Sequence, residues 1–117
     1  MKRVVIESPY AGSIEGNELA ANVLYARMCL LDSLNRGEAP IASHLLHTQV
    51  LDDTDPAQRK MGIAAGVAWH TAADLIVFYV DRGWSRGMEA ARGYAVHRGV
   101  PYVERNLPKY QLRTGGV

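Results

Sequence analysis

Short runs of consecutive apolar residues alternate along the chain with longer segments that have helical spacing. Val4-Val5-Ile6, within residues 3–8, and the run at residues 75–80 contain no charged position, as in strands buried on both faces of a parallel sheet. Two shorter runs, at residues 40–44 and 100–105, predict two further strands. The run at 75–80 is the longest uninterrupted apolar one, and we expect it to be the central strand.

The segments between these strands have the periodicity of helices at residues 18–35, 56–71 and 85–97. Asp55-Pro56 is typical of a helix N-cap followed by proline at the first helical position, and Gly99 is typical of a helix end. Residues 45–54 are expected to be a loop. The order β-α-β-α-β-α-β predicts an α/β fold: a parallel four-stranded sheet with right-handed crossovers and helices on both faces.

The helix expected at 18–35 has two apolar faces. The face expected to pack on the sheet consists of Leu19, Val23, Ala26, Leu30 and Leu34. The second face consists of Leu24, Met28 and Leu31. One sheet needs less apolar surface than this, so the helix suggests a subunit contact, and we expect a homo-oligomer, a dimer or higher.

Length and composition predict one ordinary globular domain. It spans residues 1–117, of which the polar tail at 106–117 is expected either to be loose or to cover a sheet edge. A net charge of +1 favours neither nucleic acid nor an anionic membrane, and no apolar run approaches the roughly 18 residues of a membrane span. Cys29 is the one cysteine, which fits a core position and makes a reducing, cytoplasmic setting the default expectation.

In parallel α/β sheets, ligands bind at the carboxyl ends of strands near the point where the strand order reverses. That rule brings together three loops: residues 8–16, 44–55 and 81–87. In the last loop, backbone N–H groups near Ser85 and Gly87 either cradle a carboxylate, phosphate or sugar hydroxyl, or Ser85 merely caps the helix. Arg86 adds positive charge for an anion.

Two other residues of that loop have alternative roles. Asp81 either binds ribose hydroxyls or caps the next backbone N–H, and Trp84 either stacks on a ring or packs beneath the loop.

The first two loops carry further candidates. Glu7 ends an apolar strand, where a carboxylate either has a buried partner or faces a ligand, and Ser8, Pro9 and Tyr10 follow it. In the second loop, His44 and His47 precede a group of acidic residues, Asp52, Asp53 and Asp55. Their spacing matches no metal-ligand pattern and acidic residues are favoured at a helix start, so we expect neither a metal nor a cofactor.

Five motifs in order carry a resemblance to a known group of proteins. They are Ile6-Glu7-Ser8-Pro9-Tyr10, Pro40-Ile41-Ala42-Ser43-His44, Ala73-Asp74-Leu75-Ile76-Val77, Ser85-x-Gly87 and Gly93-Tyr94-Ala95. With these the chain resembles the nucleoside 2-deoxyribosyltransferase-like group, and in particular its short members from bacteriophages and bacteria. The resemblance implies a small Rossmann-like or flavodoxin-like domain that binds nucleotides or nucleotide-derived ligands.

That group exchanges bases on a deoxyribose through a glutamate nucleophile on the third helix. The resemblance places this position at Ala91, four residues after Gly87 and two before Gly93. Glu89 lies about 200° around the helix from Ala91, so it projects from nearly the opposite face. Asp55 is the residue that would match the acidic group handling the leaving base.

We therefore expect binding or sequestration of a nucleoside, nucleotide or ADP-ribose-like molecule without transferase activity. The expected contacts are Ser8, Pro9, Tyr10, His44, Asp81, Trp84, Ser85, Arg86 and Gly87. The alternative is an N-glycosidic bond hydrolase or a deoxyribosyltransferase-like enzyme whose acidic residue is Glu7, Asp55 or Asp81. A third possibility is an interaction protein with a vestigial pocket.

Overall fold

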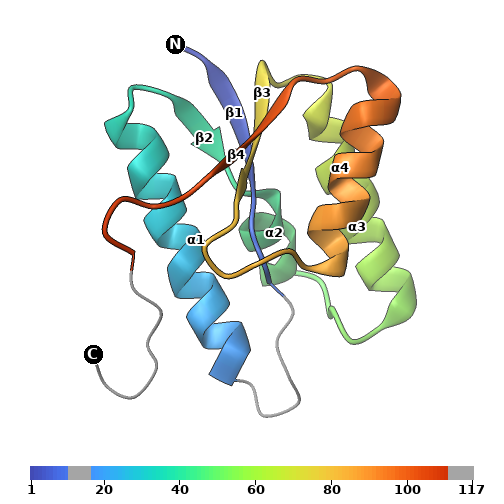
Figure 1. Ribbon diagram of the computed structural model, residues 1–117. Helices are drawn as coiled ribbons and strands as arrows, with labels where there is room; N and C mark the ends of the chain where they lie inside the picture. Colours follow the sequence, from blue (N-terminus) through green and yellow to red (C-terminus); the bar gives the residue numbers. More distant parts are fainter. Residues whose placement is uncertain (11–16, 111–117) are drawn as a thin grey trace.

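A computed structural model describes residues 1–10 and 17–110 of the chain (Figure 1). The strands are β1 (Arg3–Glu7), β2 (Ala39–Ile41), β3 (Leu75–Tyr79) and β4 (Tyr102–Arg105). The helices are α1 (Asn17–Asn35), α2 (Ser43–Leu46), the 3-10 turn η1 (His47–Gln49), α3 (Pro56–His70) and α4 (Arg86–Arg98). All strand pairs are parallel and the strand order is β2-β1-β3-β4, so the predicted α/β fold with a parallel four-stranded sheet is confirmed.

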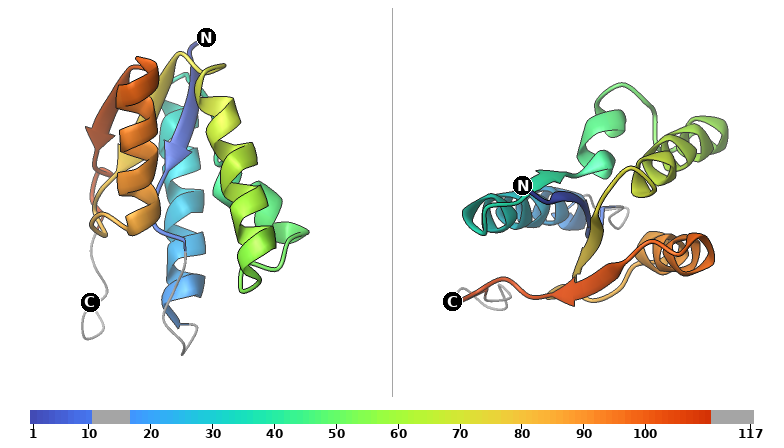
Figure 2. Two further views of the ribbon diagram at one scale, coloured as in Figure 1. Left: turned by 90° about the vertical axis from the view of Figure 1, so that its right-hand side faces the viewer. Right: turned by 90° about the horizontal axis from the view of Figure 1, so that it is seen from above.

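Helix α1 covers one face of the sheet, and α3 and α4 cover the other (Figure 2). The chain steps from β1 to β2 in one direction and from β2 to β3 and β4 in the other. Right-handed crossovers in opposite directions place their helices on opposite faces. The point where the direction reverses lies between β1 and β3, at the centre of the sheet.

Alternate residues of the two central strands, β1 and β3, pack into two separate cores on opposite faces of the sheet. On the α1 side, the buried side chains include Val4, Ile6, Val77 and Tyr79 from the sheet and Tyr25 and Cys29 from α1. On the α4 side, they are Val5, Ile76 and Phe78 from the sheet and Met88, Ala91 and Ala95 from α4. Strands that bury both faces have no polar alternation, which explains why these apolar runs were predicted correctly.

The second strand is shorter than predicted, and the expected loop after it is partly helical. The strand expected at 40–44 ends at Ile41, and α2 and η1 occupy much of 45–54. Leu45 of α2 packs against the α1-side core. Gly66 of α3 lets α2 approach closely, since a Cβ there would lie 2.8 Å from the Ser43 hydroxyl oxygen. These contacts favour a helical turn over continuation of an edge strand.

The core face of α1 differs from the predicted one. Its fully or almost fully buried residues are Asn22, Tyr25, Ala26, Cys29 and Ser33. Leu34, expected in the core, is 56% exposed, and Leu19 is also exposed. Buried polar residues displace the apolar stripe because they have partners: Ser33 donates to Glu38, and Asn22 accepts from Arg82. Leu24, Met28 and Leu31 are exposed, as expected for the second face.

The segment after β4 packs on the α1 side. Leu107 is buried, and the ring of Tyr110 lies edge-on to Tyr25 with 4.9 Å between centroids. The remaining tail, residues 111–117, and residues 11–16 of the first expected loop lie outside the described residues. In the part of the chain that the structure describes, no helix has the length and apolar content needed to cross a bilayer.

Candidate functional site

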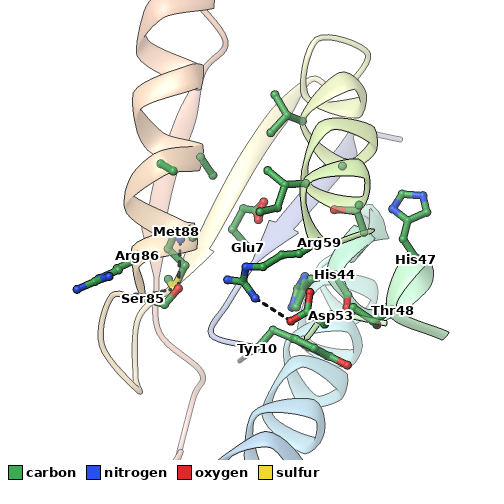
Figure 3. A pocket seen from close by; sticks show the side chains of 18 of the residues that line it. Glu7, Tyr10, His44, His47, Thr48, Asp53, Arg59, Ser85, Arg86 and Met88 are labelled. Atoms are coloured by element: carbon green, nitrogen blue, oxygen red, sulfur yellow. Dashed lines mark hydrogen bonds and ion pairs between the residues drawn. The ribbon is translucent and has the colours of Figure 1, made fainter. Parts of the chain in front are cut away.

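A cavity of about 380 Å³ opens between α3 and α4 at the carboxyl end of β1 (Figure 3). Its wall is built from the end of β1, from α2, η1 and the loop before α3, from one side of α3, and from α4 as far as Tyr94. This position is beside the reversal point between β1 and β3, where the strand-end rule places a ligand site. Of the residues expected to bind ligand, it brings together Ser8, Tyr10, His44, Ser85, Arg86 and Gly87.

Glu7 is the last residue of β1, and its side chain points into this cavity (Figure 3). The side chain of Glu7 is 15% exposed, and its Oε1 lies 3.3 Å from Nε2 of His70, whose side chain is 1% exposed. A carboxylate only accepts hydrogen bonds, so an ionised Glu7 requires the hydrogen on Nε2 of His70. Glu7 therefore has a buried partner and also faces the cavity, which combines the two alternatives open from the sequence.

Sequence reasoning missed His70, although one signal was present. Gly62, Gly66 and His70 are spaced by four residues, so they share one side of α3. The two glycines line the cavity, and His70 continues the same side to the end of the helix beneath Glu7. This spacing indicates one side of α3, which faces Leu51 at Gly62, Ser43 of α2 at Gly66 and Glu7 at His70.

Ser8 and His44 form a second polar pair in the cavity wall. The Ser8 hydroxyl oxygen lies 2.8 Å from Nε2 of His44, and the ring of Tyr10 stands edge-on to the imidazole at 6.1 Å. Burial lowers the pKa of His44, and the negative charge of Glu7 only partly opposes this effect. The buried Nδ1 of His44 has no hydrogen-bond partner among the described residues. His44 is therefore expected to be uncharged at neutral pH.

The start of α4 supplies donors to the opposite wall. Ser85 caps the helix, since its hydroxyl accepts from the backbone N–H of Met88 at 3.1 Å. Within the described residues, the backbone N–H groups of Arg86 and Gly87 have no acceptor, and both residues line the cavity. The side chain of Arg86 extends away from the cavity in Figure 3. Ser85 is thus both a helix cap and part of the wall.

Asp53 and Arg59 form an ion pair at the cavity wall that sequence reasoning did not identify. Arg59 Nη1 donates to Asp53 Oδ2 at 2.8 Å, and both side chains are partly exposed (Figure 3). The pair joins the loop before α3 to the helix itself. Other lining residues that the sequence did not single out are Thr48, Gln58, Ile63 and Val67, and Tyr94 of the Gly93-Tyr94-Ala95 motif lines the cavity too.

Asp81 does not line the cavity. It accepts hydrogen bonds from the Tyr25 hydroxyl at 2.5 Å and from the backbone N–H of Leu107 at 2.9 Å. Burial, together with the bond to Asp81, raises the pKa of Tyr25 well above its ordinary value, so the phenol stays protonated as the donor. Asp81 therefore joins α1 to the segment after β4.

Three other expected residues also lie outside the cavity wall. Trp84 packs on Phe78 with 4.9 Å between ring centroids, and the guanidinium of Arg92 covers it at 4.3 Å. Asp55 caps α3 through the backbone N–H of Ala57, and Pro9 is buried without lining the cavity. Of the carboxylates considered for chemistry, Glu7 alone lines the cavity.

A family described as a domain of unknown function (DUF7768) has a sequence model that matches residues 2–105. The chain belongs to the DUF7768 family. The match spans all the strands and helices that the structure describes and the whole described lining of the cavity. No curated protein matches the chain.

Two positions on α4 bear on what this DUF7768 domain can do. Ala91 lines the cavity and is 4% exposed, so it presents only a methyl group there. Glu89, two residues earlier, is exposed and does not line the cavity. No group of three or more His, Cys, Asp or Glu side chains that could hold a metal occurs in residues 1–10 and 17–110.

Proposed function

We propose that the protein binds a nucleoside- or nucleotide-sized small molecule in the cavity between α3 and α4. The observation that carries this proposal is a cavity of about 380 Å³ at the sheet's reversal point, with the carboxylate of Glu7 facing into it. Small-molecule sites have volumes of about 300–1,000 Å³ and combine apolar walls with a few polar groups. This cavity has both features.

The wall provides a suitable environment for each part of such a ligand. Ile63 and Val67 offer apolar surface for a flat ring. The Glu7 carboxylate is an acceptor for hydroxyl or N–H donors, and the free backbone N–H groups at the start of α4 are donors for a carboxylate or phosphate. Asp81 and Trp84 are not part of this proposal, because their side chains are engaged elsewhere.

Binding is favoured over glycosyl transfer by the residue at position 91. The resemblance to the deoxyribosyltransferase-like group puts a nucleophilic glutamate there, and Ala91 has no nucleophile. A second candidate, hydrolysis of an N-glycosidic bond, is favoured by Glu7, which could deprotonate a water in the cavity. Incubation with nucleosides and with NAD tests it: release of free base that is lost in Glu7→Gln would support hydrolysis.

Thermal unfolding with a panel of nucleosides, nucleotides and ADP-ribose tests the binding proposal. A ligand at about 100 times its Kd adds about 2.7 kcal/mol to the free energy of unfolding and raises Tm. Ala90→Trp, which fills the cavity wall, should abolish the shift, and Ala68→Trp, an exposed position on α3 away from the wall, should keep it. No shift with any compound, or equal shifts in both variants, would overturn the proposal.

A further inference from the structure

We propose that Glu7 recognises the vicinal hydroxyls of a pentose, so that the cavity selects ribosides over 2'-deoxyribosides. The inference rests on the proposed function, since it names the part of the ligand that this carboxylate binds. It adds a chemical class and a direction of selectivity that the volume and position of the cavity do not give.

The carboxylate of Glu7 has unused acceptor capacity directed at the cavity. A carboxylate has about four lone-pair sites. Within the described residues, His70 occupies one of them on Oε1, and Oε2 has no donor. Figure 3 places the Glu7 side chain between α3 and α4, at the centre of the labelled wall residues. A group bound beside it must therefore bring hydrogen-bond donors.

Neutral hydrogen-bond donors can satisfy the free sites of Glu7. The other carboxylate of the wall, Asp53, is already paired with Arg59. Glu7 itself has a buried imidazole N–H at 3.3 Å, which satisfies part of its charge. Two adjacent hydroxyls supply two donors to the free sites of Glu7 and add no charge to the cavity.

Two hydroxyls on neighbouring carbons fit the free sites of one carboxylate better than a single hydroxyl does. Carboxylates at strand ends of α/β folds bind ribose hydroxyls in this way. Removing the 2'-hydroxyl leaves a partly buried acceptor unpaired, and such a loss is costly because the group has already given up most of its water. We expect a 2'-deoxyriboside to bind about tenfold or more weakly than its riboside.

His70 is a positioning residue in this arrangement. Its Nε2 fixes Oε1 of Glu7, and the ring is almost completely buried beneath the strand end. The remaining oxygen is thereby held toward the cavity. Replacing His70 with Gln, which retains an N–H donor, should preserve the selectivity better than His70→Leu.

Isothermal titration with adenosine, guanosine, cytidine and uridine, each beside its 2'-deoxy form, tests the inference. The unmodified protein should bind at least one riboside about tenfold or more tightly than its 2'-deoxy counterpart. Glu7→Gln should weaken that riboside about tenfold and leave the deoxy form nearly unchanged, so that the two affinities converge. Glu104→Gln, an exposed carboxylate on β4, is the matched control and should change neither.

The possible failures are distinguishable. If none of these compounds binds, and none of the nucleotides does, the proposed function fails and the inference with it. If ribosides and 2'-deoxyribosides bind the unmodified protein equally, the binding function stands and the inference is overturned. That comparison needs no variant, so it decides the question even if Glu7→Gln does not fold.

Discussion

Arg105, at the end of β4, holds both carboxylate oxygens of Glu38, which precedes β2, at 2.8 and 3.0 Å. These two strands form opposite edges of the sheet and share no backbone hydrogen bonds. The same guanidinium donates to the hydroxyl of Tyr79, which in turn donates to Asp32 of α1. A two-point ion pair thus connects the two edges through the α1 side of the sheet.

Breaking this ion pair should destabilise the fold. Both side chains are only 13% exposed, so Glu38→Gln leaves a nearly buried guanidinium without its counter-charge. We expect Glu38→Gln or Arg105→Met to lower the free energy of unfolding by about 2–4 kcal/mol in urea denaturation. Arg3→Gln, which removes the exposed pair with Asp74, is the control and should cost less than about 1 kcal/mol. Equal losses in all three variants would contradict this prediction.

The same pair should make stability depend on acid pH. The Arg105 guanidinium holds the pKa of Glu38 below its usual range. A carboxyl whose pKa is lower in the folded state than in the unfolded state stabilises the fold above the unfolded pKa, about 4.3. This stabilisation is lost as the pH falls through the folded pKa. Urea denaturation at pH 7, 4.5 and 3 should therefore show a larger loss for the unmodified protein than for Glu38→Gln.

His44 should add a second pH dependence nearer to neutrality. Burial lowers the pKa of its imidazole in the folded state, so the unfolded chain binds the proton more readily. The contribution of the neutral His44 to stability is therefore full above the pKa of the unfolded state, about 6.5. It decreases as the pH falls from there toward the pKa of the folded state. We expect His44→Gln to flatten the unfolding free energy between pH 7.5 and 5.5. An unchanged slope would show that the folded pKa of His44 is not lowered.

Asp81 and Glu7 should respond differently to the loss of charge. Asp81→Asn and Tyr25→Phe disturb the bonds between α1, Asp81 and Leu107, and each should cost about 1–3 kcal/mol of stability. Neither should change the affinity for a cavity ligand by more than about twofold, because Asp81 lies outside the wall. Glu7→Gln should instead weaken binding of a cavity ligand and change the free energy of unfolding little. Urea denaturation measures the effect on stability, and isothermal titration measures the effect on affinity. A large affinity loss in Asp81→Asn would show that Asp81 contributes to ligand binding.

A side chain at Gly66 should destabilise the fold. A Cβ there would lie 2.8 Å from the Ser43 hydroxyl oxygen, so in Gly66→Ala either this hydroxyl rotates away or α2 shifts from α3, and we expect a loss of about 1–3 kcal/mol. Gly93 on α4 has no atom within 4 Å of a Cβ, so Gly93→Ala should stabilise the helix by up to about 1 kcal/mol. Combining Gly66→Ala with Ser43→Gly should recover part of the loss. Thermal unfolding of the three variants measures these differences.

The sequence of strands and helices along the chain and most helix ends could be predicted because their signals are local. A strand buried on both faces leaves an apolar run, as in β3, and Asp55-Pro56 and Ser85 cap their helices in the predicted way. The short helix α2 was missed because tertiary contacts, of Leu45 with the core and of Ser43 with Gly66, determine it.

The sequence predicts which loops meet at the site, but not which side chains of those loops line the cavity. The strand-end rule brings Ser8, His44 and Ser85 together, but it does not say which way a side chain on a loop points. Asp81 turns toward Tyr25 instead of the cavity. The pairing of Glu7 with His70 joins residues 63 positions apart, and the spacing of Gly62, Gly66 and His70 indicates a shared side of α3 without identifying the partner.

The interactions that join the sheet edges and those that form the cavity lie on opposite faces of the sheet, so substitutions can change one without the other. The network of Arg105, Glu38 and Tyr79 lies on the α1 side, and the cavity lies between the two helices of the other side. A substitution in α3 or α4 can therefore alter the shape of the cavity without disturbing the bonds that join the sheet edges. Proteins that share this architecture could diverge in what they bind while keeping the same scaffold.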